Sequence, residues 1–145
     1  MKSILRAVLF CSGIFFIVSC GSDNTTSAVY TDSVTFGTGN VGWNITGETT
    51  SFINNPNING VTIYYRVETE DDMKGSNINL EIEKNSETGF DQVHIVYLTN
   101  PSKSGHVVVG SYLHMLGEGT YRANARLLAT NQVVATKDYV VTNAQ

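Results

Sequence analysis

Cysteine is almost absent from this sequence, and its scarcity limits the chemistry open to most of the chain. The 145 residues include two cysteines, Cys11 and Cys20, and both lie within the first twenty positions. The chain beyond Cys20 therefore has no thiol, which excludes a disulfide, a cysteine nucleophile and a thiolate metal site there. Roughly 125 residues remain, enough to bury about two-thirds of their unfolded surface without a covalent cross-link.

Basic residues are also few. Nine lysines and arginines stand against thirteen aspartates and glutamates. Two of the nine, Lys2 and Arg6, precede Cys20, so the chain after it has seven basic and thirteen acidic residues, a net charge of −6. Nucleic-acid binding depends on clustered lysine and arginine, so we expect no nucleic-acid partner. Electrostatic adhesion to an anionic membrane surface is disfavoured for the same reason.

Long hydrophobic runs are missing as well. The longest, residues 7–18, has about a dozen residues, whereas a membrane-spanning helix needs about twenty. This run follows Lys2 and Arg6, and the combination of a positive start and a short apolar core is typical of a secretory signal.

The end of that run carries a more specific pattern. The residues Ile17-Val18-Ser19-Cys20 are followed by a polar segment that begins Gly21-Ser22-Asp23. This resembles the lipobox of bacterial lipoproteins, in a relaxed form, because Leu commonly stands at the position of Ile17 and Gly or Ala at that of Ser19. The resemblance implies that residues 1–19 are a cleaved signal peptide, that Cys20 carries the lipid, and that the membrane is a partner through this anchor. Gly21 rather than Asp after the cysteine favours the outer membrane.

Residues 20–27 form a polar tether, and the sequence pattern of residues 28–145 is typical of an all-β domain. Short segments rich in Val, Ile, Tyr and Thr alternate with clusters of Gly, Asn, Pro, Ser and Asp, and no stretch shows helical spacing. The predicted strands are 29–36, 41–53 with an interruption near Gly47, 61–68, 77–83, 92–98, 106–113, 120–129 and 132–142. Two Val-Val pairs in the last strand blur its alternation, which either a bulge or a strand buried on both faces would explain.

The segment Leu116–Tyr121, sequence LGEGTY, is the most diagnostic for the fold. It leads into an alternating strand, a Thr130-Asn131 turn and a final strand. The arrangement resembles the tyrosine corner of immunoglobulin-like and fibronectin type III-like domains, in which a Tyr hydroxyl returns to nearby backbone. The resemblance implies an immunoglobulin-like antiparallel β-sandwich of seven or eight strands.

Two loop motifs have an alternative functional interpretation. Residues 37–42 match G-x-G-x-x-G, but the strand-like Trp43-Asn44-Ile45-Thr46 follows where a dinucleotide site needs a helix, so we predict a hairpin loop. The acidic stretch Glu68–Asp72 could supply oxygen ligands for Ca²⁺, although Lys74 brings a competing charge. We interpret it as a solvated loop and leave the calcium alternative open. We predict no cofactor.

Neither the histidines nor the tyrosines form a recognisable site. His94, His106 and His114 lack metal-motif spacing, so we predict no metal and no catalytic residues. Tyr64 is the best candidate for an exposed ring that could stack on a sugar. We therefore expect a lipid-anchored cell-envelope protein with a non-catalytic binding or structural domain and an unidentified protein or glycan partner. The alternatives are a carbohydrate-binding or proteinase-inhibitor-like module and an envelope hydrolase assembled from scattered residues.

Strand count also predicts an orientation. If the chain reverses at every connection and the first strand starts nearest the anchor, the loops 37–40, 70–75, 100–105 and 130–131 share the far end. Loops on a rigid sandwich commonly carry recognition, so we expect partner contact at that far end.

Overall fold

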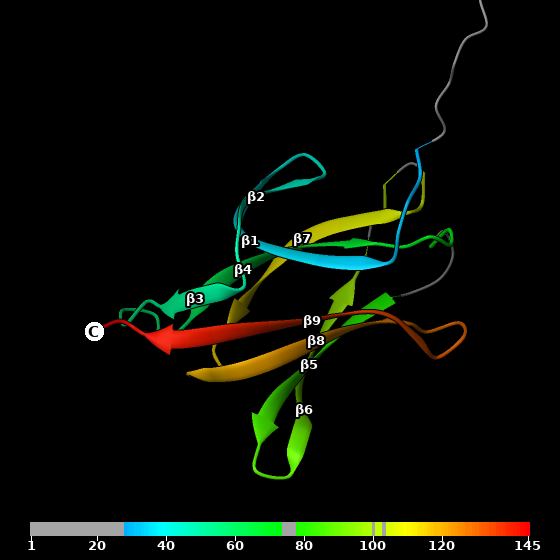
Figure 1. Ribbon diagram of the computed structural model, residues 1–145. Helices are drawn as coiled ribbons and strands as arrows, with labels where there is room; N and C mark the ends of the chain where they lie inside the picture. Colours follow the sequence, from blue (N-terminus) through cyan, green and yellow to red (C-terminus); the bar gives the residue numbers. More distant parts are fainter. Residues whose placement is uncertain (1–27, 74–77, 100, 103) are drawn as a thin grey trace, which may run out of the picture.

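The computed structural model describes residues 28–73, 78–99, 101–102 and 104–145, and these residues form nine strands and no helix. Two sheets face each other as a β-sandwich (Figure 1). The first sheet has the order β2 (Asn44–Glu48), β1 (Ser33–Val41), β4 (Val61–Glu68) and β7 (Val107–His114). The second has the order β3 (Ser51–Asn54), β9 (Gln132–Asn143), β8 (Gly119–Leu127), β5 (Ile78–Ser86) and β6 (Gly89–Leu98). The predicted all-β class is confirmed, with nine strands in place of seven or eight.

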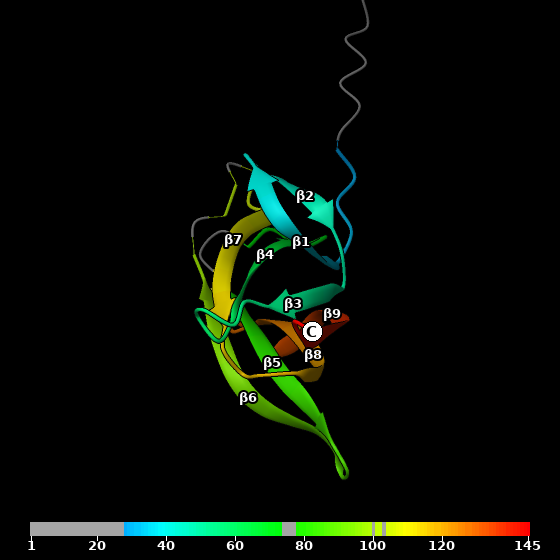
Figure 2. The same cartoon turned by 90° about the vertical axis from the view of Figure 1, so that its left-hand side faces the viewer.

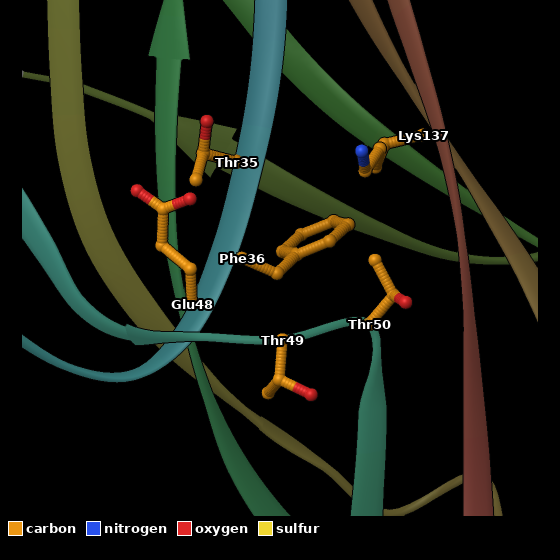
Figure 3. A pocket seen from close by; sticks show the side chains of 6 residues that line it. All are labelled: Thr35, Phe36, Glu48, Thr49, Thr50 and Lys137. Atoms are coloured by element: carbon orange, nitrogen blue, oxygen red, sulfur yellow. The ribbon is translucent and has the colours of Figure 1, made fainter.

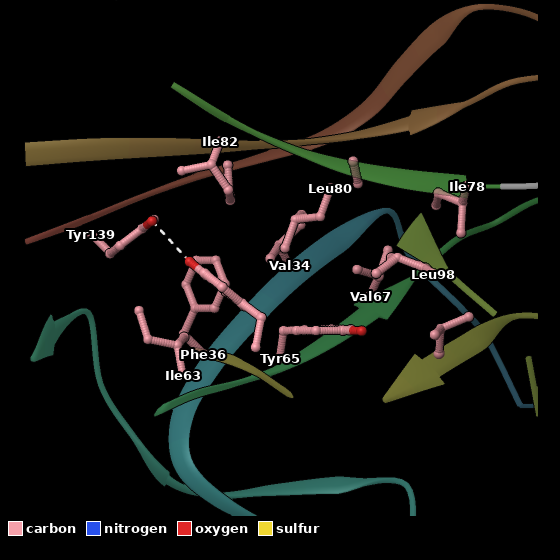
Figure 4. Packing of buried hydrophobic residues seen from close by; sticks show 14 of the residues in the cluster. Val34, Phe36, Ile63, Tyr65, Val67, Ile78, Leu80, Ile82, Leu98 and Tyr139 are labelled. Atoms are coloured by element: carbon pink, nitrogen blue, oxygen red, sulfur yellow. Dashed lines mark hydrogen bonds between the residues drawn. The ribbon is translucent and has the colours of Figure 1, made fainter. Parts of the chain in front are cut away.

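The core lies between the sheets and follows from strict alternation along the strands. In β4, Ile63, Tyr65 and Val67 are buried while the residues between them are half-buried. The inward residues of β5 and β8 meet them from the other sheet. Figure 4 shows this packing, with side chains of the first sheet (Val34, Phe36, Ile63, Tyr65, Val67) against those of the second (Ile78, Leu80, Ile82, Leu98, Tyr139). Since alternate side chains of a strand point to opposite faces, this pattern is what the sequence requires.

Of the two explanations for the blurred alternation in the last strand, the structure shows the bulge. The pairing of β8 with β9 shifts between Ala125, which faces Ala135, and Arg126, which faces Val133. Val134 is the extra residue, and it lies half-buried against the core. A bulge of this kind explains how the adjacent valines fit a strand of period two.

The predicted strand 41–53 is wrong, because this segment contributes to both sheets. Strand β1 continues to Val41 and turns at Gly42 and Trp43 into β2 of the first sheet. Thr49 and Thr50 then carry the chain across to β3, which pairs with β9 in parallel. The second sheet is therefore mixed, in contrast to the predicted all-antiparallel sandwich. The hairpin predicted at 37–42 is present, but its loop was placed too early: residues 37–41 belong to β1, and the turn lies at Gly42 and Trp43.

The crossing at Thr49 and Thr50 adds one reversal of direction, which inverts the predicted orientation. Strand β1 is antiparallel to β4, with Ser33 opposite Glu68, so the chain enters the sandwich at the end where β4 leaves it. Backbone N–H groups mark this contact: that of Thr31 donates to Glu68 Oε1 at 2.9 Å, and that of Glu70 donates to Asp32 Oδ1 at 2.8 Å. The acidic loop is thus beside the entry of the chain and not at the far end (Figure 1).

The tyrosine corner predicted from the LGEGTY segment is confirmed. Tyr121 is fully buried, and its hydroxyl donates to the carbonyl oxygens of Leu116 at 2.8 Å and Gly117 at 3.0 Å. Its ring also stacks on Tyr139, with the two centroids 5.3 Å apart. The corner therefore ties the connection before β8 to the interior of the second sheet.

Removing parts of Tyr121 should separate the two contributions. Tyr121→Phe deletes only the hydroxyl donor and should lower the free energy of unfolding by about 1 kcal/mol. Tyr121→Ala also leaves a cavity and should cost about 3–5 kcal/mol. Urea unfolding measures both, and Tyr97→Phe is the matched control because Tyr97 is 71% exposed on β6. A Tyr121→Phe variant as stable as the parent would mean that the corner hydrogen bonds contribute nothing net.

Candidate functional site

A groove with a volume of about 450 Å³ opens at the end where the chain enters the sandwich. In Figure 2 the hairpin of β1 and β2, whose turn carries Trp43, lies at the top, and the hairpin of β5 and β6 lies at the bottom. The groove combines two aromatic rings, one guanidinium group, two hydroxyl groups and one valine; its lining residues are Tyr30, Trp43, Arg66, Ser102, Ser104 and Val107. We call it the Tyr30–Trp43 groove.

Tyr30 is fixed in place by contacts with residues far along the chain. Its ring stacks on His106 with the centroids 4.5 Å apart and the planes 6° from parallel. Its hydroxyl donates to Ser104 Oγ at 3.2 Å, and Ser104 Oγ lies 2.8 Å from Ser102 Oγ. His106 is held in turn, because its Nδ1–H donates to the carbonyl oxygen of Thr69 at 3.0 Å. One wall of the groove is therefore preorganised, so a ligand need not order it.

The opposite wall depends on Arg66. The Nε–H group of Arg66 donates to the carbonyl oxygen of Trp43 at 3.1 Å, which holds the turn between β1 and β2 against β4. The guanidinium also forms an ion pair with Glu68. Trp43 remains 46% exposed at this turn. The groove thus presents an exposed indole ring beside the guanidinium of Arg66, whose positive charge is balanced by Glu68.

A second hollow of about 290 Å³ lies where the chain crosses between the sheets. Figure 3 shows Glu48 and Lys137 on opposite sides of Phe36, with Thr35, Thr49 and Thr50 around them. Phe36 belongs to the buried core, so the accessible part of this hollow is formed by hydroxyl groups and two exposed charged side chains. It offers no exposed aromatic face, unlike the Tyr30–Trp43 groove.

The third cluster of interest is buried and its polar groups are already paired. Tyr112 donates to the Tyr139 hydroxyl at 2.8 Å, the dashed contact in Figure 4. His114 lies 3.3 Å from both the Tyr139 hydroxyl and the Gly117 carbonyl oxygen. Since a carbonyl can only accept, His114 Nε2 carries the proton and Nδ1 accepts from Tyr139. Burial lowers the pKa of His114 and raises those of Tyr112 and Tyr139. We call these residues, with Tyr121, the tyrosine cluster, and its hydrogen bonds connect β7, β9 and the segment before β8.

The three histidines lie in three different environments. His114 is buried in the tyrosine cluster, His106 is half-buried under Tyr30, and His94 is exposed on β6. Only His106 contributes to the groove, by supporting Tyr30.

Residues of the acidic stretch Glu68–Asp72 form ion pairs and hydrogen bonds with other parts of the protein. Glu68 pairs with Arg66 and accepts from the backbone of Thr31. The carbonyl oxygen of Asp71 accepts from the Thr69 hydroxyl at 2.6 Å. Within residues 28–73, 78–99, 101–102 and 104–145, no three His, Cys, Asp or Glu side chains gather in an arrangement that could hold a metal ion. Cys20, the predicted lipid-attachment residue, lies outside the described residues.

The sequence did not single out the lining residues of the groove, Tyr30 and Trp43 among them, and its best candidate for an exposed tyrosine, Tyr64, is wrong. Tyr64 is half-buried in the middle of β4, whereas Tyr97 is the more exposed tyrosine. Tyr30 was placed within a strand starting at residue 29, but β1 begins at Ser33. The ring of Tyr30 is held in the groove by stacking on His106. His106 is far from Tyr30 in the sequence, so no local pattern predicts this contact.

The fold and the groove define a two-sheet β-sandwich with a preorganised surface site. No family model matches the sequence, and no curated protein matches it. None of the described residues forms a helix long and apolar enough to cross a membrane.

The buried histidine predicts an acid-dependent loss of stability. The pKa of His114 lies below its ordinary value of 6.5 in the folded state because of burial, with smaller contributions from Lys84 and His94. As the pH falls, the unfolded chain binds the proton first, so this contribution is complete above about pH 6.5 and is lost towards the folded-state pKa. The urea midpoint should therefore fall between about pH 7.5 and pH 5, measured by circular dichroism.

The matched variants are His114→Gln and His94→Gln. His114→Gln should be less stable at neutral pH but lose less stability on acidification, whereas His94→Gln should follow the parent closely, because His94 is exposed and makes the smallest of the contributions to the pKa of His114. An unchanged pH dependence in His114→Gln would assign the acid sensitivity to other groups.

Proposed function

We propose that this protein is a lipid-anchored component of the bacterial cell envelope whose sandwich acts by binding and not by catalysis. The observation that carries the proposal is the lipobox-like sequence at Cys20, separated by only residues 21–27 from the described domain. The residue after the cysteine, Gly21, supports an outer-membrane location. The sandwich and its tyrosine corner support an immunoglobulin-like assignment for the domain.

The Tyr30–Trp43 groove supports a binding role for this domain. Its titratable neighbours are used to hold its walls: Arg66 pairs with Glu68 and with the Trp43 carbonyl, and His106 supports Tyr30. Groups held in this way orient a ligand-contacting surface. Loops supported by a rigid scaffold are where such folds place recognition, and four separate segments of the chain meet at this groove.

The anchor is tested by changing each cysteine separately. In the parent, the N-terminal peptide should begin at Cys20 and carry the mass of its acyl chains, and the protein should sediment with membranes. Cys20→Ala should remove the acyl mass and release the protein to the soluble fraction, because two or three acyl chains give stable anchoring where none remains. Mass spectrometry of the N-terminal peptide is the direct measurement.

Cys11→Ala is the control, because Cys11 lies within the predicted signal segment and should not affect lipidation. An unmodified parent peptide, starting either before or after Cys20, would rule out the anchor.

A further inference from the structure

We propose that the Tyr30–Trp43 groove is a binding site for an uncharged saccharide chain. This inference rests on the proposed binding function and names the ligand class of that site. Its first support is the pair of aromatic rings in one groove of about 450 Å³. A sugar ring has a face of C–H groups that packs on an aromatic face, and Trp43 has nearly half of its surface available for such packing.

The polar groups of the groove fit the rim of hydroxyls around a sugar ring. Ser102 and Ser104 contribute hydroxyl groups, which both donate and accept hydrogen bonds. Arg66 uses its Nε–H group on the Trp43 carbonyl and still has other N–H donors beside the groove. A few fixed polar groups on a largely apolar and aromatic surface are the usual composition of a small-ligand site.

Charge selects an uncharged ligand over an anionic one. Among the described residues that line the groove, Arg66 is the one cation, and its guanidinium is paired with Glu68. Asp32 and Glu70 lie at the same end, joined by the hydrogen bond from Glu70 N–H to the Asp32 carboxylate. A phosphate or carboxylate ligand would have to displace Glu68 and approach these acids, whereas a neutral hydroxyl ligand would not.

The position of the groove restricts where such a ligand would be met. The chain enters the sandwich beside the groove, since Tyr30 itself lines it. From Cys20 to residue 28 an extended chain can reach no more than about 29 Å. A saccharide chain bound here would therefore lie close to the membrane that holds the proposed anchor.

The experiment uses the chain from Ser22 onward, because the hydrophobic core is built from residues between Val34 and Val141 and is complete in it. Cellohexaose, chitohexaose, maltohexaose and xylohexaose are titrated separately, with the fluorescence of Trp43 as the readout. Trp43 is the single tryptophan of the sequence, so any change reports on the groove. At least one of the four should give a saturable change with a dissociation constant between about 10 μM and 1 mM.

Variants locate the binding by calorimetry with the saccharide that binds. Trp43→Ala and Tyr30→Ala should each weaken binding by about tenfold or more, and Tyr97→Ala, which removes an exposed ring from the second sheet, should bind as the parent does. Circular dichroism confirms that each variant is folded. No saturable change with any of the four saccharides, or equal losses in Trp43→Ala and Tyr97→Ala, would overturn the proposal.

A charged probe tests the ligand class. Hexagalacturonate, which carries carboxylates, should bind more weakly than the best neutral saccharide, and tighter binding would overturn the assignment to uncharged chains. Failure of the anchor is recognised separately, because an unmodified Cys20 peptide would leave the saccharide titration unchanged. Absence of saccharide binding with an acylated Cys20 would remove this inference alone.

Discussion

The hydrogen bond from Tyr112 to Tyr139 is the interaction on which the interior of the sandwich depends. Tyr112 lies on β7 of the first sheet and Tyr139 on β9 of the second, so a polar contact joins the two sheets inside an apolar core. Buried hydroxyls are costly unless they are paired, and pairing requires that the sheets keep one separation and one register. His114 completes the chain to the Gly117 carbonyl, which the Tyr121 corner also uses. The two sheets and the connection before β8 are thereby held as one unit.

The place where the chain changes sheets decides which segments lie at each end of this rigid unit. At Thr49 and Thr50 the chain leaves β2 and joins β9 of the second sheet through β3. The Thr49 N–H donates to the Phe36 carbonyl at 3.1 Å, and the Thr49 hydroxyl donates to the Ser51 carbonyl at 3.1 Å, so the crossing is itself held by hydrogen bonds. It places the entry of the chain, the acidic loop and the segment before β7 at one end. Three of the four segments that line the groove meet at this end because of the added reversal.

The sequence predicted those parts of the structure that depend on neighbours along the chain. Strand 61–68 was predicted with its observed bounds because strict alternation marks both its faces. The Tyr121 corner was predictable because its partners are only four and five residues away. The change of sheet was not predictable in this way. The pattern of residues 41–53 predicts one interrupted strand, because the neighbouring residues carry no signal for which of the two sheets an edge strand joins. Because each later loop inherits its end of the sandwich from the number of preceding reversals, one missed reversal misplaced them all.

The groove shows the same limit at the level of a site. Tyr30 lines it because His106, 76 positions later, lies parallel beneath its ring. Trp43 lines it because Arg66, on β4, donates a hydrogen bond to the Trp43 carbonyl oxygen and so holds the turn in place. Tyr64, by contrast, looked available from alternation alone, yet its place in the middle of β4 leaves it half-buried. An aromatic ring becomes a binding surface when other residues hold it in place while one face stays open to solvent. That condition belongs to the assembled sandwich, and Trp43 meets it at the end of the domain nearest to Cys20 in the chain.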